Sequence, residues 1–263
     1  MWNPYLPLDS ASRKIHGIVA VLAVLILWSL VSGLGWVGPA KLPAPWQVAK
    51  AFGYLSWDSG QGRSLLLSAV LSSVSRVLMA GILVILIGIP IGVLMGASPR
   101  INAALSPLVD PFRSAPVVAL LPILVMWLGI GEVMKVGFLF VGAVVFLIPM
   151  TRDAIQAVPR KYYISAIDLG ATPWEAVRMS LLPMAMPRIA DAIIVAVSVM
   201  WTYITVAEYV NAGSGLGQLI QNARRFSAMD QVFAGIFVII ALALITYQVM
   251  IAIKHRMFPW ESA

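Results

Sequence analysis

Residues 64–97 read SLLLSAVLSSVSRVLMAGILVILIGIPIGVLMGA, and this apolar run decides the fold class. A transmembrane helix needs about 20 mostly apolar residues, and Arg76 is the only charged residue in this longer run. A helix of this length is roughly 50 Å long, well beyond the ~30 Å hydrocarbon core of a bilayer. We therefore expect a membrane-spanning helix that tilts, bends near Pro90 or projects into water.

Three glycines in this run predict where it packs. Gly88, Gly92 and Gly96 recur at every fourth residue and so share one face of the helix. Small residues at this spacing allow two helix backbones to approach closely within a membrane.

The composition of the whole chain points to the same class. Of the 263 residues, 60% are hydrophobic and 11% are charged, and the mean hydropathy is +0.92. Soluble domains carry about 25% charged residues, so lipid must be the solvent for much of this chain. The absence of cysteine excludes a disulfide framework, a thiolate metal site and a cysteine nucleophile. Two histidines, His16 and His255, give no basis for a metal centre or a catalytic triad.

The apolar runs predict an all-α polytopic membrane protein with a single transmembrane domain over residues 1–263. Its third span contains Pro107, Pro111, Pro116 and Pro122, which predict a kinked helix. The six expected spans are about 17–34, 64–97, 105–128, 134–150, 189–207 and 232–253.

The net charge of +7 reports topology rather than nucleic-acid binding, because the basic residues flank the apolar spans. Six spans place both termini on one side of the membrane. That side carries Arg13, Lys14, Arg100, Arg152, Arg160, Lys161, Arg178, Lys254 and Arg256, against Lys41, Lys50, Arg63, Arg224 and Arg225 on the other. The positive-inside rule therefore predicts cytoplasmic termini and a cytoplasmic loop over residues 152–187.

This cytoplasmic loop has the sequence of two short helices joined by a tight turn. Gly170 is placed to end the first helix with a positive φ. Thr172, Pro173 and Glu175 then have the spacing of a capping box with proline at the first helical position. We expect the second helix to end before Pro183, and Pro187 to mark the start of the fifth span.

The same loop resembles the EAA loop of permease subunits from binding-protein-dependent ABC importers. That pattern is Glu-Ala-Ala, three residues, Gly, nine residues, Ile, one residue and Leu-Pro. Ala166, Gly170, Leu182 and Pro183 match it, whereas Ile164, Ser165 and Ser180 depart from it. Further strings resemble the nitrate, taurine, aliphatic-sulfonate and bicarbonate branch: 42–45 (LPAP), 113–116 (RSAP), 121–124 (LPIL), 127–131 (WLGIG) and 213–217 (GSGLG).

The resemblance implies a type I ABC importer permease in the bacterial inner membrane, working by alternating access as a dimer, most simply of two copies of this chain. Two cytoplasmic ATPase subunits would bind ATP and Mg, so this chain would hold no cofactor and catalyse no reaction. A periplasmic or lipid-anchored binding protein would deliver an oxyanion or sulfonate such as nitrate, bicarbonate or taurine. The loop residues expected to couple the ATPase to transport are Ala166, Asp168, Leu169, Gly170, Ala171, Thr172, Glu175, Leu182 and Pro183.

Polar residues within or near the spans are candidates for the translocation path, because charge at membrane depth is costly. Ser198 and Thr202 share a helical face with Thr205. The structural alternative is that the charges pair or lie at water-exposed ends and that the hydroxyls join helices. The candidates are Arg76, Arg113, Ser198, Thr202, Tyr203 and Glu208.

Other functions stay open from the residues alone. An importer of a neutral or aromatic compound is the first alternative. An ATP-independent transporter or channel would leave the two-helix loop unexplained. An intramembrane enzyme lacks a readable catalytic group.

Overall fold

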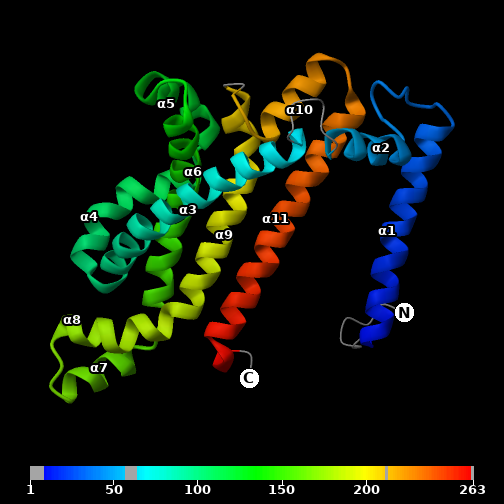
Figure 1. Cartoon of the computed structure of the whole chain (residues 1–263). Helices are drawn as coiled ribbons and strands as arrows, with labels where there is room; N and C mark the ends of the chain where they lie inside the picture. Colours follow the sequence, from blue (N-terminus) through cyan, green and yellow to red (C-terminus); the bar gives the residue numbers. More distant parts are fainter. Residues whose placement is uncertain (1–8, 57–63, 211–212, 262–263) are drawn as a thin grey trace. The chain divides into compact units, whose positions relative to one another are not determined.

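The computed structural model describes residues 9–56, 64–210 and 213–261 (Figure 1). Within these ranges every regular element is helical. The chain forms two compact units, one of residues 1–66 with 220–237 and one of residues 67–219 with 238–263. Arg63, counted above in the charge bias, and the ends of the chain lie outside the described residues.

The first unit is organised around Trp28 of α1 (Ser10–Gly33). Its ring packs 6.1 Å from Phe233 and 5.9 Å from Phe237, both at the start of α11 (Met229–Met257). Its indole N–H donates to the carbonyl of Pro43 at 3.0 Å. A helix that the sequence did not lead us to expect, α2 (Pro45–Ser56), follows within the predicted loop. It begins there because proline fits the first turn of a helix and leaves no N–H unsatisfied.

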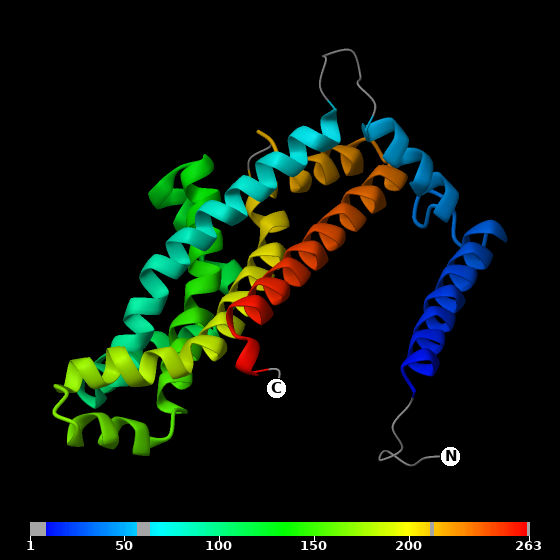
Figure 2. The same cartoon turned by 60° about the horizontal axis from the view of Figure 1, so that its bottom comes forward.

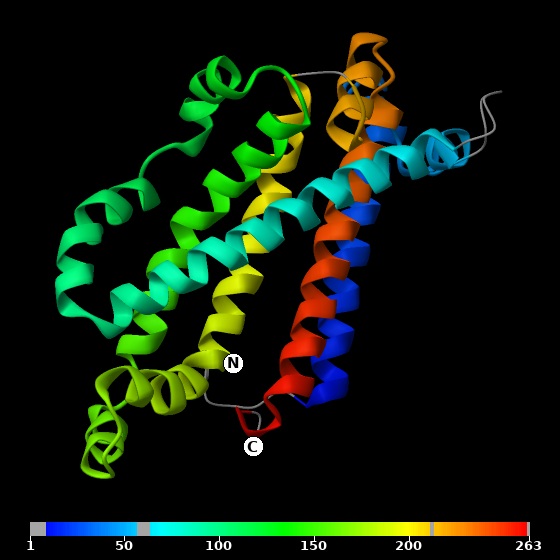
Figure 3. The same cartoon turned by 60° about the vertical axis from the view of Figure 1, so that its left-hand side comes forward.

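The second unit is built on three long helices, α3 (Leu65–Ala97), α6 (Glu132–Gln156) and α9 (Leu182–Tyr209). Figure 3 shows α3 crossing α6 and α9. Their shared core contains Val77, Ala80 and Val84 of α3, Leu139, Ala143 and Leu147 of α6, and Ala192, Ala196, Met200, Trp201 and Ile204 of α9. The apolar faces turned away from this core remain exposed in the single chain, as expected for helices in lipid.

The glycine face of α3 packs against α6 as the spacing predicted. A Cβ on Gly92 would lie 2.5 Å from the Cβ of Thr151, and one on Gly96 would lie 2.7 Å from the Cβ of Ile155. Gly88 meets Leu147 in the same way. Because the residue numbers of the contacting pairs increase together along both helices, α3 and α6 run in the same direction. The segment between them must therefore return the chain to the end from which α3 started.

That returning segment differs from the single kinked helix expected over 105–128. It consists of two helical pieces, Pro99–Arg113 and Val117–Leu128, bent by 98°. The first contains α4 (Pro99–Val109) and η1 (Asp110–Arg113), and the second contains η2 (Val117–Leu120) and α5 (Leu121–Leu128). Proline disfavours helical conformation in the residue before it, so Pro116 breaks the helix here rather than bending it.

The predicted end of the second loop helix before Pro183 is wrong. α8 (Pro173–Ala176) continues through a π-turn, η3 (Val177–Leu181), into α9 without a break. Pro183 has no N–H to offer the carbonyl of Met179. Just before the proline, the π-turn directs the N–H of Leu182 to the carbonyl of Val177, five residues back. Pro183 and Pro187 therefore lie inside one helical run, Pro173–Tyr209.

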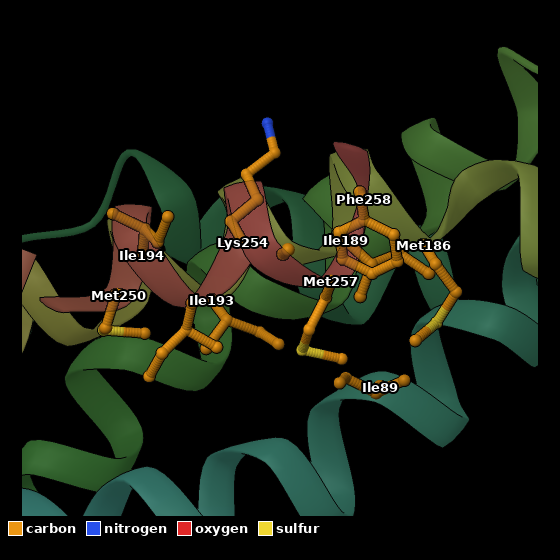
Figure 4. A pocket seen from close by; sticks show the side chains of 11 residues that line it. Ile89, Met186, Ile189, Ile193, Ile194, Met250, Lys254, Met257 and Phe258 are labelled. Carbon is orange, nitrogen blue, oxygen red and sulfur yellow. The ribbon is translucent and has the colours of Figure 1, made fainter. Parts of the chain in front are cut away.

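The end of α11 lies beside the start of α9. Lys254 Nζ donates to both carboxylate oxygens of Asp191 at 2.8 Å. Beside this ion pair a crevice of about 240 Å³ separates the two helices, and its lining is apolar except for Lys254 (Figure 4). The C-terminal end of α11 therefore lies at the same end of the second unit as the α7–α8 loop.

Five helices of the described chain are long and apolar enough to cross a membrane, or six spans if the bent pair counts as one. The shorter elements are α7 (Arg160–Asp168), α10 (Leu216–Arg225) and η4 (Pro259–Glu261). The loop of α7 and α8 projects beyond the ends of α6 and α9 in Figure 2.

We predict that Gly92→Ala destabilises the protein by about 1–3 kcal/mol, because the added methyl overpacks the α3–α6 contact. Gly81→Ala is the matched control: Gly81 is also buried on α3, but no atom outside its own helix backbone lies within 4 Å of its Cβ position. Thermal unfolding in detergent, followed by tryptophan fluorescence, measures both. Equal midpoints for the two variants would contradict the assigned contact.

Candidate functional site

Arg76 is the centre of a buried polar cluster at the end of the second unit opposite the α7–α8 loop. Its side chain is 2% exposed. Nε and Nη2 donate to the two carboxylate oxygens of Glu132 at 2.6 and 2.7 Å, and Nη1 donates to Glu208 at 2.6 Å. The carbonyl and hydroxyl oxygens of Ser214 accept the remaining two bonds at 2.8 and 2.6 Å. All five N–H groups of the guanidinium therefore have an acceptor.

Glu208 is equally well satisfied on the opposite side of the guanidinium. Its side chain is 0% exposed. Besides the bond from Arg76, Oε1 accepts from the Ser73 hydroxyl at 2.7 Å and Oε2 accepts from the amide of Gly217 at 2.7 Å. Ser73 in turn accepts from the amide of Leu216 at 2.9 Å. Glu208 is thus fixed by α3 and by the 213–217 loop.

Gly215 shows why this loop is rich in glycine. Its φ is +114°, a conformation that L side chains rarely adopt. A Cβ there would collide with the carboxyl group of Glu208 and lie 2.5 Å from Nη1 of Arg76. The glycine at this position therefore has a visible role: it lets the backbone pass directly over the ion pair.

Glu132 and Lys135 complete the cluster at the start of α6. Lys135 Nζ donates to Glu132 at 3.1 Å, and the lysine side chain is 1% exposed. Among the described residues Glu132 is the only hydrogen-bond partner of this ammonium, and residues 211–212 are not described. In contrast to Glu208, Glu132 has a side chain that is 57% exposed. The two cations and two carboxylates give the cluster no net charge.

The candidate path residues do not form one site. Arg76 and Glu208 are the pair described above. The hydroxyls of Ser198 and Thr202 donate to carbonyls one turn back in α9, those of Ile194 and Ser198, and both side chains are exposed.

Tyr203 and Arg113 lie elsewhere. Tyr203 packs edge-on against Phe138, with ring centroids 5.7 Å apart, and fills the space above Gly142. Arg113 is exposed at the end of η1.

The turn between α7 and α8 has the geometry that its sequence predicted. Gly170 has a φ of +93°, its N–H donates to Ile167 at 2.9 Å, and the N–H of Ala171 donates to Ala166 at 3.0 Å. These two bonds are a Schellman motif, which satisfies the last carbonyls of α7. Thr172 and Glu175 form the expected capping box, in which the Thr172 N–H donates to Glu175 at 2.8 Å.

The loop is buried on one side and exposed on the other. Ala176 is fully buried, and Val177 packs with Val93 of α3, Ala154 and Ile155 of α6, and Ala185 and Ile189 of α9. On the other side Leu169 is 88% exposed and Met179 is 76% exposed, with Trp174 and Asp168 also exposed. The loop therefore contacts the ends of α3, α6 and α9 on one side and presents a partly apolar, exposed surface on the other.

A second, smaller polar contact holds the broken segment to α6. Arg152 donates to Asp110 at 2.9 and 3.1 Å, to Ser106 at 3.3 Å and to Asp153 at 2.9 Å. In the part of the chain that the structure describes, no three His, Cys, Asp or Glu side chains are grouped so that they could hold a metal ion.

Sequence reasoning did not select Ser73, Glu132, Lys135, Ser214 or Gly215. The sequence carries one signal for two of them: Glu132 and Lys135 are three residues apart, the spacing of an ion pair on one helix face. No local pattern in the sequence pairs Arg76 with Glu208, because the two residues are far apart along the chain.

Comparison with known proteins agrees with this architecture. Residues 88–259, more than half of the chain, match the family described as "Binding-protein-dependent transport system inner membrane component". The chain belongs to this family. It is a multi-pass membrane permease, and the resemblance drawn from the loop and the short strings is confirmed.

Two relatives place the chain more narrowly within these inner membrane components. It is 31% identical to the taurine transport system permease protein TauC of Escherichia coli over 252 residues, which cover 95% of this chain and 92% of the relative. It is 27% identical to the putative aliphatic sulfonates transport permease protein SsuC of Bacillus subtilis, over 94% and 88% of the two chains.

A solved structure supports the fold. The chain resembles a chain of the MetNI methionine ABC transporter in an inward-facing conformation, with a TM-score of 0.63 and 24% identity. The likeness covers 76% of this chain and 97% of that chain. The predicted type I ABC importer permease fold is confirmed.

We predict that Arg76→Met destabilises the protein by about 3–5 kcal/mol, because it leaves Glu208 charged and buried without a cation. Glu132→Gln removes the other carboxylate from the same guanidinium. Its own charge is half exposed, but its loss leaves the buried ammonium of Lys135 without a carboxylate, so the expected cost is about 1–3 kcal/mol. Arg76→Met combined with Glu208→Gln recovers part of the loss, since no unpaired buried charge remains. Denaturant unfolding in detergent measures all three. Equal losses for Arg76→Met and Glu132→Gln would contradict the assignment.

Proposed function

We propose that this chain is the membrane-spanning subunit of an ATP-driven importer that moves a small sulfonate or oxyanion from periplasm to cytoplasm by alternating access. The observation that carries the proposal is its similarity, over nearly its whole length, to a permease named for taurine transport. The similarity to a permease named for aliphatic sulfonates supports the same solute class. In this proposal the chain works with a second copy of itself, two ATPase subunits and a solute-binding protein.

We further propose that the ATPase binds the α7–α8 loop. The exposed side chains Leu169, Trp174 and Met179 offer an apolar docking surface, while Val177 on the opposite side packs against α3, α6 and α9. A displacement of the loop by the ATPase would therefore act on three long helices at once. Where the family pattern has a glutamate this chain has Ile164, which is also exposed, so apolar contact carries more of the docking here.

The orientation follows from the same loop. The C-terminal end of α11, with Lys254 and Arg256, lies at the loop's end of the second unit, and Arg152, Arg160, Lys161 and Arg178 lie in or beside the loop. We propose that this end is cytoplasmic and that the Arg76 cluster lies toward the periplasm.

Uptake into proteoliposomes tests the solute class. The permease, its ATPase and its binding protein are reconstituted together, with ATP inside the vesicles. We expect ATP-dependent uptake of taurine, an alkanesulfonate, nitrate or bicarbonate, and no uptake without the ATPase. Uptake confined to an uncharged or aromatic compound would refute the anionic solute, and uptake without the ATPase would refute the ATP-driven mechanism.

The coupling role of the loop predicts a strong effect of Gly170→Val. No atom lies within 4 Å of a Cβ at Gly170, so the cost arises only from the positive φ and amounts to about 1–2 kcal/mol of backbone strain. We expect normal membrane insertion but weakened ATPase association and a sharp fall in transport. Gly170→Asn is the matched control, because asparagine tolerates positive φ better than valine. Thr172→Ala should be intermediate, since loss of a cap typically costs about 1 kcal/mol.

Co-purification of the ATPase and uptake rates measure these variants. If Gly170→Val retains a stably bound ATPase and transports normally, the loop does not couple ATP hydrolysis to transport.

A further inference from the structure

Glu132 occupies an unusual position for a carboxylate in an ion-pair cluster. It bonds to two buried cations, Arg76 and Lys135, yet its own side chain is 57% exposed. Glu208 bonds to the same guanidinium but is fully buried and has bonds from Ser73 and Gly217 that hold it there. Of the two carboxylates only Glu132 can turn away into solvent, because Glu208 is enclosed on all sides.

The place that the Glu132 carboxylate fills attracts anions for three reasons. Arg76 directs Nε and Nη2 toward it. The ammonium of Lys135, buried and with no other acceptor among the described residues, also points to it. It further lies at the N-terminal end of the 25-residue helix α6, where Gly131 provides no side-chain cap. Free amides and the helix dipole favour a negative charge at such an end.

The charge balance limits the number of anions to one. With Glu132 in place, two cations face two carboxylates. When Glu132 turns away, Arg76, Lys135 and Glu208 leave one net positive charge, which a single monoanion balances.

An apolar groove begins at the same place. It has a volume of about 500 Å³, and Glu132 is its only charged lining residue. The rest of its wall is apolar, formed by Met79, Leu83 and Ile87 of α3, Leu128 of α5, and Val133, Val136, Gly137 and Phe140 of α6. A ligand that reached Arg76 and Lys135 through this groove would present a negative head group to the cluster and an apolar tail to the wall.

We propose that the position of the Glu132 carboxylate is an exchangeable anion subsite, which takes the head group of a small organic monoanion while its apolar tail lies in the groove. Glu132 serves as an internal competitor that keeps the buried cations paired when no ligand is present. This inference rests on the proposed import of a sulfonate or oxyanion, and it assigns to that solute a specific contact on the permease. Arg76 and Lys135 are the binding residues.

Binding to the purified permease tests the subsite without the other subunits. The chain is placed in phosphatidylcholine nanodiscs and titrated with butanesulfonate, with butanesulfonamide as the uncharged control. Calorimetry and the shift of the thermal unfolding midpoint report binding, because a ligand that binds only the folded state stabilises it. We expect weak, saturable binding of the sulfonate to the unmodified chain and none of the sulfonamide.

The variants are expected to move the affinity in opposite directions. Glu132→Gln removes the competitor and should tighten butanesulfonate binding by about tenfold or more, whereas Lys135→Gln should weaken it by a similar factor. Asp153→Asn is the matched control, because Asp153 is also a half-exposed carboxylate bonded to an arginine but lies at the other end of α6. Glu132→Ala provides a second test if Glu132→Gln is poorly folded.

Each other outcome is decisive. Unchanged affinity in both Glu132 variants, or the same gain in Asp153→Asn, would overturn the subsite. Stabilisation by phosphatidylglycerol nanodiscs with no response to butanesulfonate would assign the position to a lipid head group and overturn it as well. If the complete importer takes up a sulfonate while these variants bind it equally, the subsite fails and the proposed function stands. If the variants show the expected binding pattern but the importer takes up only an uncharged compound, the subsite stands and the proposed solute class fails.

Discussion

A guanidinium buried beside a membrane must have an acceptor for every N–H, and this requirement organises one end of the permease. Arg76 of α3 finds its five acceptors on α6, on α9 and in the 213–217 loop. Each of these bonds fixes the rotation and depth of the element that provides it. The close passage of Gly215 over the ion pair is a consequence, because a loop that supplies acceptors to a buried arginine must bring its backbone within reach. The cluster is neutral as a whole, which lowers the cost of placing four charges at the end of a transmembrane bundle.

The opposite end of the same helices is held by apolar packing and by backbone geometry. Glycines on α3 let α6 approach closely, and an apolar cluster beneath α8 joins α3, α6 and α9 to the loop. The π-turn at 177–181 keeps α8 continuous with α9, so a helical backbone joins the loop to α9 on that side. Close packing transmits a displacement rather than absorbing it. Such an arrangement suits a loop through which force from a partner would reach the membrane-spanning helices.

The sequence predicted those features that depend on neighbouring residues and did not predict those that depend on distant ones. The apolar runs, the glycine face, the positive φ of Gly170 and the capping box all follow from spacings of a few residues. The predicted stop at Pro183 was wrong because the π-turn at 177–181 carries the helix past the proline. The third span proved broken because Pro116 acts on the residue before it. Arg76 and Glu208 were singled out by the cost of charge in a membrane, but their pairing with each other and with Glu132 requires the fold.

The two carboxylates of the cluster carry the same charge but differ in burial. Glu132 and Glu208 contact the same guanidinium at the same shortest distance, 2.6 Å. Glu208 has no route to water, and its bonds to Ser73 and Gly217 tie it to the backbone of the loop, so its contribution is to the fold. Glu132 faces an open groove at the first turn of α6, and its departure from the cluster would leave two cations in need of an anion. Burying a charge in a transmembrane bundle is costly, so the buried Arg76 must keep an anion beside it. Because Glu132 is exposed, however, that anion need not always be Glu132.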